Sequence, residues 1–391
     1  MSMYFVGIDI SKYKHDCCII SATNQHIVSK FTITNDKSGF EQLLISLNSL
    51  SEPEDIKIGF ESTAHYALNL ELSLENAHHS FMEVNPVLIK EYKKSTTLRR
   101  TKTDSVDCES IARWLMTVEY KPHSKGFYHA YSLKSLTRLR DRLIRQRSFY
   151  LVKITNVLDH TFPEFKPFFN ERLSKTALYL LENYGSAEKM SRMNSASYDK
   201  LRCISRGRFS IQQFLCLKEL AANTVGVNNS IFDIELNSLL NLHNSLCREI
   251  ENLETEITRL IEEVHPHYMS IPGIGPISAA VIYAEYGDIS NFSNPGQMLA
   301  FAGIEPGIND SGTESHGGRM VKHGSSQLRY VLLNACLPLI RFDLTFATYY
   351  AKKRAEGKKH RVAITHVAKK LIRVIYALER QDVDFNAQKI R

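Results

Sequence analysis

Four carboxylates are candidates for a shared site, and two of them occupy positions where a globular protein rarely leaves a charge without a partner. Asp9 interrupts a short apolar run near the start of the chain, and Glu61 directly follows another. Asp104 and Asp107 lie three residues apart, so on a helix they would share one face. Burying a carboxylate is costly unless it is paired or binds a metal ion. The sequence therefore predicts that these acids bind divalent cations or form ion pairs.

Four carboxylates from two strands and one helix suit a pair of Mg²⁺ (or Mn²⁺) ions about 4 Å apart. Such a site activates a nucleophile and stabilises the leaving oxygen in phosphodiester cleavage. Each acid also has an ordinary structural explanation. Asp104 suits the start of a helix, Glu61 the neighbourhood of a helix cap, and Asp9 an ion pair.

The net charge of +7 is unevenly distributed along the chain. Residues 86–153 hold 16 Lys/Arg against 6 Asp/Glu, and residues 341–391 hold 13 against 5, whereas residues 231–270 hold 2 against 8. Two basic blocks predict a polyanionic partner, most commonly nucleic acid, with solvated helix faces as the alternative. In the first block, the side chains expected to contact phosphates are Arg99, Arg100, Lys102, Arg138, Arg142 and Arg145.

The first 118 residues alternate strand and helix patterns. Apolar runs predict strands over residues 4–10, 16–20, 26–33 and 56–60, and helical spacing predicts helices over 40–50 and 66–74. The sequence therefore predicts an α/β layer domain. Three early strands followed by strands separated by helices is the order expected of a ribonuclease-H-like fold, although other mixed sheets fit the pattern too.

The middle of the chain is mainly helical. From Leu236 to Val264 apolar residues alternate steps of three and four, which is a coiled-coil seam of about four heptads. We expect this seam to join two chains, which predicts a homo-oligomer, a dimer or a tetramer. A helix hairpin buried within one chain is the alternative.

A new unit begins at the segment Ile271-Pro-Gly-Ile-Gly-Pro276. Gly273 and Gly275 permit a tight turn, and Pro276 suits the first position of a helix. This pattern resembles a helix-hairpin-helix element, whose backbone N–H groups hold a DNA phosphate. A plain corner between two helices is the alternative. Further helices are predicted over about 327–340 and 361–379.

Several compartments and site classes are disfavoured. No apolar run approaches the roughly 18 residues that a membrane span needs, and the acid at position 9 interrupts any signal-peptide core. The seven cysteines form no Cys-x-x-Cys pair. We expect a cytoplasmic, nucleoid-associated protein with no membrane partner, no disulfide framework and no zinc cluster.

Seven short motifs follow one another along both ends of the chain. They are Val6–Ser11, Phe60–Thr63, Asn85-Pro86, Arg100–Asp107, Ile271–Gly275, Lys322–Gly324 and Leu328-Arg329. Together they resemble the DEDD transposases of bacterial insertion sequences, in the insertion-sequence family one hundred and ten, which includes Piv-type DNA invertases. The resemblance covers roughly residues 4–160 and 268–375 and is loose over about 165–230.

The resemblance implies a RuvC-like domain at 1–125 with Asp9, Glu61, Asp104 and Asp107 in its four acidic positions. It further implies a helical linker and coiled-coil region at 126–265, and a mainly α transposase domain with a basic tail helix at 266–391. Members of this family pair with a structured bridge RNA that reads donor and target DNA.

The family also supplies a nucleophilic serine, which by spacing falls on Ser311. A pair of small residues is common beside that serine, whereas this chain has Asp310-Ser-Gly-Thr313, so Ser315 is an alternative and Ser325 a weaker one. Residues 306–326 are rich in glycine and polar residues, and Asn309-Asp-Ser-Gly312 has the composition of a turn, where most serines only bond the backbone. The side chains expected to hold phosphate nearby are Arg319, Lys322, His323 and Arg329.

The sequence therefore predicts an RNA-guided DNA transposase that uses a serine and metal-bound carboxylates. Two alternatives stay open. One is a metal-dependent RuvC-like nuclease or junction resolvase in which the serine is structural. The other is a non-catalytic nucleic-acid-binding protein that keeps its acids for ion pairs.

Overall fold

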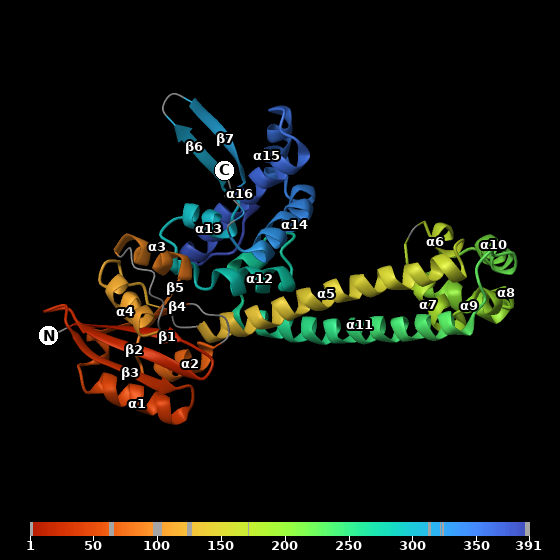
Figure 1. The fold of residues 1–391 in the computed structure, drawn as a ribbon. Helices are drawn as coiled ribbons and strands as arrows, with labels where there is room; N and C mark the ends of the chain where they lie inside the picture. The colour runs from red at the N-terminus through yellow and green to blue at the C-terminus, as the bar shows by residue number, and fades with distance from the viewer. Residues whose placement is uncertain are drawn as a thin grey trace. The chain divides into compact units, whose positions relative to one another are not determined.

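The computed structural model describes residues 3–61, 66–96, 104–122, 127–170, 172–311, 314–320, 322 and 324–387. For some of these residues, among them 104–105, 306–311 and 314–319, it describes the backbone but not the side chains. The chain forms two compact units, Met1–Phe127 and Tyr128–Arg391 (Figure 1).

The first unit is built on a five-stranded sheet in the order β3-β2-β1-β4-β5. β1, β2 and β3 pair antiparallel, and β4 pairs parallel with both β1 and β5. The strands are β1 Tyr4–Ile10, β2 Lys14–Ser21, β3 Ile27–Thr34, β4 Ile56–Glu61 and β5 Phe81–Val84. The four predicted strands are confirmed. The sequence missed β5 because four residues are too few to show an alternating pattern.

Helices cover both faces of this sheet. α1 and α2 share an apolar core with Val6 and Ile8, whereas α3 and α4 share another with Phe5. Alternation along β1 explains the division, since successive side chains point to opposite faces. The helices are α1 Lys37–Asn48, α2 Leu68–Asn76, α3 Pro86–Thr96 and α4 Asp104–Leu115. The mixed sheet between helical layers is compatible with the predicted ribonuclease-H-like class.

Two ionisable side chains are buried on the α1–α2 face. His15 is fully buried and its ring stacks on that of Phe40, with 6.1 Å between centroids. Glu71 is 2% exposed. Burial, and then the hydrogen bond and charge of Glu83, raise the pKa of Glu71 to about 9, while burial lowers the pKa of His15. Both side chains are therefore mainly neutral near pH 7.

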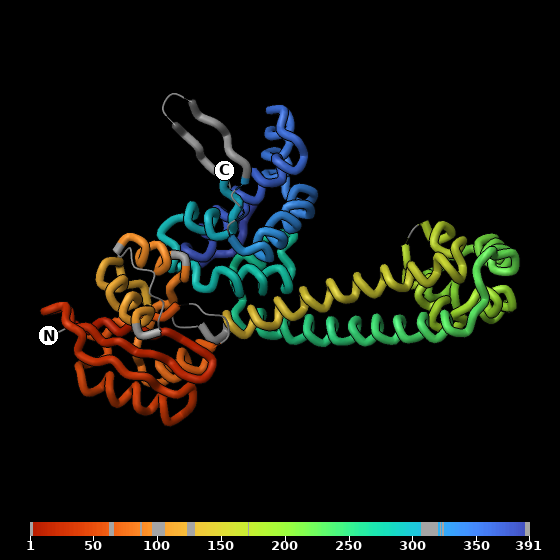
Figure 2. The backbone as a smooth tube through the Cα atoms, viewed as in Figure 1, coloured from red at the N-terminus to blue at the C-terminus, as the bar shows by residue number. Residues whose placement is uncertain are grey.

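The second unit contains two long helices, α5 (Phe127–Thr161) and α11 (Ser230–Val264), which lie side by side (Figures 1 and 2). Arg140 of α5 donates a 2.7 Å hydrogen bond from Nε to Glu254 Oε1 of α11. Leu133, early in α5, shares a core with Ile261, late in α11, and further along α5 the packing partners come from the start of α11. The two helices are therefore antiparallel.

The predicted long helix over the heptad seam is confirmed, but the reason for expecting it to join two chains is wrong. Ile250 and Ile257 are 3% and 0% exposed within a single chain, because α5 covers the seam. The structure thus matches the alternative, a helix hairpin buried within one chain. A homo-oligomer stays a prediction.

The segment between α5 and α11 folds into short helices with an apolar core of their own. Leu158 of α5 and Leu240 of α11 belong to this core. The helices are α6 Phe165–Phe168, α7 Lys175–Tyr184, α8 Ala187–Ser191, α9 Ser195–Ile204 and α10 Ile211–Ala222. Four of these described helices begin with a side-chain cap, supplied by Ser174, Ser186, Asn194 and Ser210.

Helices and one β-hairpin follow α11. They are α12 Pro276–Tyr286, α13 Pro295–Ala302, β6 Pro306–Ser311, β7 Glu314–Met320, α14 Ser326–Phe342, α15 Leu344–Ala355 and α16 His360–Gln381. Val367, Leu371 and Ile375 of α16 are fully buried, so this helix runs through the core that also takes up the end of α11. The two predicted helices correspond to α14 and α16.

Within the described ranges, no single helix has the length and apolar character to cross a membrane. α14 and α15 meet the length and composition only as a pair, which is bent by 106°. Leu328, Leu332 and Leu339 of α14 are fully buried inside the second unit.

Candidate catalytic and nucleic-acid sites

Asp9 and Glu61 lie at the same end of two adjacent parallel strands. The register pairs Ile8 of β1 with Phe60 of β4, so the two acids occupy the next position on each strand. Since Ile8 and Phe60 belong to the core under α1 and α2, alternation directs Asp9 and Glu61 to the other face, which α4 covers. The structure therefore brings these two predicted acids together.

Two glycines let α4 approach this face closely. A Cβ on Gly7 would overlap the backbone of Cys108 and of the next turn of α4, and one on Gly59 would lie 2.8 Å from Leu115 Cδ1. Cys108 thus lies over the middle of β1, while Leu115, at the other end of the helix, shares a core with Phe5. α4 therefore runs opposite to β1, and its first residues lie at the strand end that carries the two acids.

Asp104 and Asp107 occupy the first turn of α4. Asp107 Oδ1 accepts a 2.7 Å hydrogen bond from Lys93 Nζ of α3, and the two side chains are 17% and 27% exposed. Of Asp104 only the backbone is described. One end of the sheet thus gathers the backbone positions of all four predicted acids. The sequence placed Lys93 in a basic block but gave no sign of its pairing with Asp107, which depends on how α3 packs against α4.

The carboxylate set suits a hard divalent cation, because Mg²⁺ and Mn²⁺ prefer oxygen ligands. Among the described side chains, no group of three or more His, Cys, Asp or Glu residues is arranged to hold a metal ion. The predicted set includes Asp104, whose side chain lies outside that part of the chain. The predicted phosphate contacts Arg99, Arg100, Lys102 and His323 also lie outside the described residues.

The glycine- and polar-rich stretch after α13 contains the hairpin β6–β7. Ser311 is the last residue of β6 and pairs with Glu314, and Ser315 of β7 pairs with Asp310. No strand was predicted here, because glycine, asparagine and aspartate are depleted in strands generally, whereas in the structure two such segments pair with each other. The side chains of Ser311, Ser315 and Arg319 lie outside the described part.

The backbone on either side of this hairpin is tightly joined. Gly303 has φ 64°, and a Cβ on it would lie 2.8 Å from the backbone N of Gly324. Arg329 Nη1 donates a 3.1 Å hydrogen bond to the carbonyl oxygen of Ala302. Arg329, which we expected to contact phosphate, therefore has a structural partner at the base of the hairpin, whereas Lys322 is exposed.

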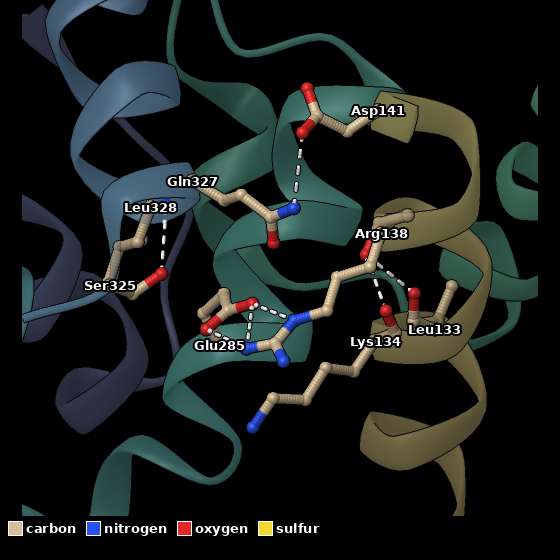
Figure 3. Close-up of polar contacts among 9 residues, drawn as sticks. Leu133, Lys134, Arg138, Asp141, Glu285, Ser325, Gln327 and Leu328 are labelled. Atoms are coloured by element: carbon tan, nitrogen blue, oxygen red, sulfur yellow. Dashed lines mark hydrogen bonds and ion pairs between the residues drawn. The ribbon is translucent and has the colours of Figure 1, made fainter. Parts of the chain in front are cut away.

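Ser325 caps α14. Its Oγ accepts a 3.2 Å hydrogen bond from the N–H of Leu328 (Figure 3). Serine is among the residues preferred at this position because its oxygen satisfies a free N–H of the first helical turn. Capping thus accounts for the weaker of the three candidate serines.

The arginines of α5 differ in their surroundings, and Figure 3 shows those of Arg138. Arg138 forms an ion pair with the buried carboxylate of Glu285 of α12, 3.0 Å between nearest atoms. Arg145 Nη2 lies 2.7 Å from Asp141 Oδ2, which also accepts a hydrogen bond from the side chain of Gln327. Arg142 is exposed. Carboxylates thus already contact two of the three α5 arginines that we expected to contact phosphates.

The two glycines before α12 have different surroundings. Gly273 has φ 97°, and a Cβ on it would lie 2.7 Å from Pro338 Cγ and 3.1 Å from the carbonyl oxygen of Ala335, both in α14. Gly275 is the N-cap of α12, and a Cβ there would meet nothing within 4 Å. Close packing against α14 explains Gly273, while the backbone at Gly275 remains accessible for the predicted phosphate contact.

Two family models match this chain in order. One, described as a transposase and of the DEDD IS110 type, matches residues 6–163, and the other, described as the transposase IS116/IS110/IS902 family, matches residues 266–351.

Among known relatives, the 42 kDa protein of insertion element IS900 from Mycobacterium paratuberculosis is 25% identical, over 96% of this chain and 95% of its own length. The pilin gene-inverting protein of Moraxella bovis is 24% identical, over 99% of this chain and 98% of its own. The 43.6 kDa protein of insertion element IS110 from Streptomyces coelicolor is 27% identical, over 60% of each chain.

Proposed function

This chain belongs to the IS110-type family of DEDD transposases, and from that premise we propose that it is an RNA-guided DNA recombinase. It cuts and rejoins donor and target DNA through a serine ester and uses carboxylates that hold divalent cations. The similarity to a protein named for inverting a pilin gene supports recombination between DNA segments. The proposed function is more specific than that of the family, whose members are DNA transposases and site-specific recombinases.

The register of β1 and β4 is the observation that carries this proposal. It sets Asp9 and Glu61 side by side, on the face and at the end of the sheet that the first turn of α4 reaches. Asp9, Glu61, Asp104 and Asp107 would hold Mg²⁺ or Mn²⁺, which when bound supplies positive charge opposite the phosphate oxygens. Lys93 holds Asp107 in place and contributes a further positive charge near the first turn of α4.

Ser311 is the proposed nucleophile. Its Oγ forms a bond to a DNA phosphorus as the bond from that phosphorus to one DNA oxygen breaks. The serine proton is lost to a base, and the leaving DNA oxygen takes up a proton. Because the step exchanges one phosphodiester bond for another of similar energy and hydrolyses none, the reverse attack by a DNA hydroxyl rejoins strands without an external energy source. The capping role of Ser325 supports Ser311 or Ser315 over it.

Further parts of the proposal follow from the family resemblance and the charge distribution. A structured bridge RNA selects the DNA sequences, and the basic blocks bind the phosphates of both nucleic acids. The protein acts as a homo-oligomer, at the chromosome in the cytoplasm, where its DNA substrate lies. In this proposal the first unit is a RuvC-like domain, and residues 266–391 form the serine transposase domain.

Trapping a covalent adduct tests this proposal. Wild-type protein with its guide RNA and labelled DNA should give a protein–DNA adduct that survives SDS, and Ser311→Ala should bind both nucleic acids but form no adduct. Ser315→Ala is the matched control and should form it. An adduct mapped to Ser315 would overturn the choice of serine.

The same experiment separates this function from the metal-dependent nuclease or resolvase. If wild-type protein cuts DNA without forming any adduct, and Ser311→Ala cuts equally well, the nuclease is correct and the serine is structural. Binding without cleavage in either Mg²⁺ or Mn²⁺ would instead support the non-catalytic alternative.

A further inference from the structure

The corner between α15 and α16 concentrates positive charge. Residues 352–361 contain six Lys/Arg and one acid, Glu356. Both oxygens of Glu356 lie 2.9 Å from Lys353 Nζ, so this acid is already paired. The remaining cations of the segment are all exposed and are Lys352, Arg354, Lys358, Lys359 and Arg361.

The backbone and side chains of this corner are held in place. Arg354 Nη1 donates a 2.8 Å hydrogen bond to the carbonyl oxygen of Lys358, and Tyr350 Oη lies 2.7 Å from His360 Nδ1. These contacts close the loop between the two helices. The exposed cations are therefore carried on a constrained loop, which lowers the entropic cost of ordering them on a ligand.

Charges from three segments meet around His366 of α16. The pKa of this imidazole is lowered mainly by burial and then by the charges of Lys353, Lys369 and Lys358. Lys353 comes from α15, Lys358 from the loop and Lys369 from α16, so their fields add at one place. Clustered positive charge of this kind attracts a polyanion.

The basic surface continues along α16 toward the β-hairpin. Arg361, Lys369 and Arg373 lie eight and four residues apart, so at 3.6 residues per turn they wind about a third of a turn around the helix from one end of the row to the other. The charges of Glu305 and Arg373 both act on Lys369, and Glu305 directly precedes β6. The row from Arg361 to Arg373 is about 18 Å long at about 1.5 Å per residue, or about five base pairs at about 3.4 Å each.

We infer that this surface, the α15–α16 corner with the Arg361–Arg373 row, binds the phosphate backbone of duplex DNA and leads it to the β6–β7 hairpin. The choice of DNA rests on the proposed function, because Lys369 of the row interacts electrostatically with Glu305, which directly precedes the hairpin that carries Ser311. The surface contacts phosphates and carries no base specificity of its own. It adds a DNA contact within the basic block at residues 341–391, which contains none of the seven short motifs.

Three full-length variants test the inference with a fluorescent random-sequence duplex of about 25 base pairs, titrated from about 50 to 250 mM salt. The corner variant is Lys358→Gln/Lys359→Gln/Arg361→Gln and the row variant is Lys369→Gln/Arg373→Gln. The control, Lys189→Gln/Lys200→Gln/Arg202→Gln, removes the same charge from exposed positions of the short helices α8 and α9.

The salt dependence of the DNA affinity should fall by about 0.9 in log–log slope for each phosphate that the protein no longer neutralises, so by about 2 to 3 for the corner variant. The control should keep the wild-type slope, and replacing the same corner lysines by arginine should also keep it. Unchanged thermal unfolding would show that the variants are folded.

If the corner and row variants kept the wild-type slope of DNA affinity against salt, the inference would be overturned. An equal reduction of that slope in the control variant would also overturn it. Weaker binding of an RNA hairpin with unchanged binding of the duplex would overturn the assignment to DNA. None of these measurements requires cleavage. Absence of a serine adduct would therefore defeat the proposed function without affecting this result.

Discussion

The guanidinium of Arg138 makes two hydrogen bonds to the carboxylate of Glu285, from Nε at 3.1 Å and from Nη2 at 3.2 Å. The Glu285 side chain is 3% exposed, so it depends on Arg138 for compensation of its charge. The pair joins α5 to α12. An arginine from a basic block thus stabilises the fold of the second unit.

Replacing Arg138 should therefore destabilise the protein more than replacing a neighbouring arginine. Arg138→Met leaves a buried carboxylate without its partner and should lower the free energy of unfolding by about 1 to 3 kcal/mol. Arg142→Met, at an exposed position of the same helix, is the control and should change it by less than about 0.5 kcal/mol. Urea unfolding followed by circular dichroism measures both. Equal midpoints for the two variants would contradict the structural role of the pair.

Gly7→Ala should displace α4. The added Cβ would overlap the backbone of Cys108, and overpacking of this kind costs about 1 to 3 kcal/mol. Gly275→Ala is the matched control, since its Cβ meets nothing within 4 Å. Thermal unfolding should show a lower midpoint for Gly7→Ala only. A stable Gly7→Ala protein would mean that α4 is not held against β1 as described.

Asp9→Asn should abolish DNA strand cleavage and leave DNA affinity nearly unchanged. The carboxylate is expected to hold a cation, while binding depends on many phosphate contacts. We expect cleavage to fall more than about a hundredfold, or about 2.7 kcal/mol in activation free energy. Asp199→Asn, at an exposed position of α9, is the control. Cleavage that survives Asp9→Asn, measured on labelled DNA in Mg²⁺ and in Mn²⁺, would remove the metal site.

Glu71 makes stability depend on pH. Its folded-state pKa of about 9 lies above its ordinary value of 4.5, so between these values the folded state holds a proton that the unfolded state has released. The contribution of Glu71 to the free energy of unfolding is therefore fully present below about pH 4.5 and is lost as the pH rises through about 9. The loss is at most about 1.4 kcal/mol per pH unit.

Glu71→Gln cannot ionise, so its free energy of unfolding should fall less than that of the wild type between pH 6 and 9. Glu52→Gln, at an exposed position, should follow the wild type. Chemical unfolding at several pH values measures the difference. Parallel pH profiles for Glu71→Gln and the wild type would show that Glu71 ionises normally in the folded state.

The sequence predicted much of the first unit, because its strands and helices carry clear apolar periods. It also indicated that Asp9 and Glu61 could converge, since one is an acid within an apolar strand and the other directly follows such a strand, but the pairing of these two strands came from the structure. It could not predict the pairing of Lys93 with Asp107 or of Arg138 with Glu285. These contacts join residues 14 and 147 positions apart, and no local pattern encodes them.

The heptad seam shows a different limit. Its spacing correctly predicted one long helix with a buried side, but the spacing is the same whether the partner helix belongs to another chain or to the same one. α5 lacks an equally regular apolar pattern, because arginines occupy many of its positions. Leu253→Lys with Ile257→Lys should accordingly disrupt the α5–α11 pair within one chain, whatever the oligomeric state.

The α5–α11 pair has an apolar core at each end, one formed with α12–α16 and the other with α6–α10. Removing seven residues from each helix at matched levels nearly preserves the facing sides and shortens the pair by about 10.5 Å. The number of heptads in the pair therefore sets the distance between the two terminal cores. The length of the pair can change in whole steps by paired insertion or deletion, while each terminal core keeps every residue that builds it.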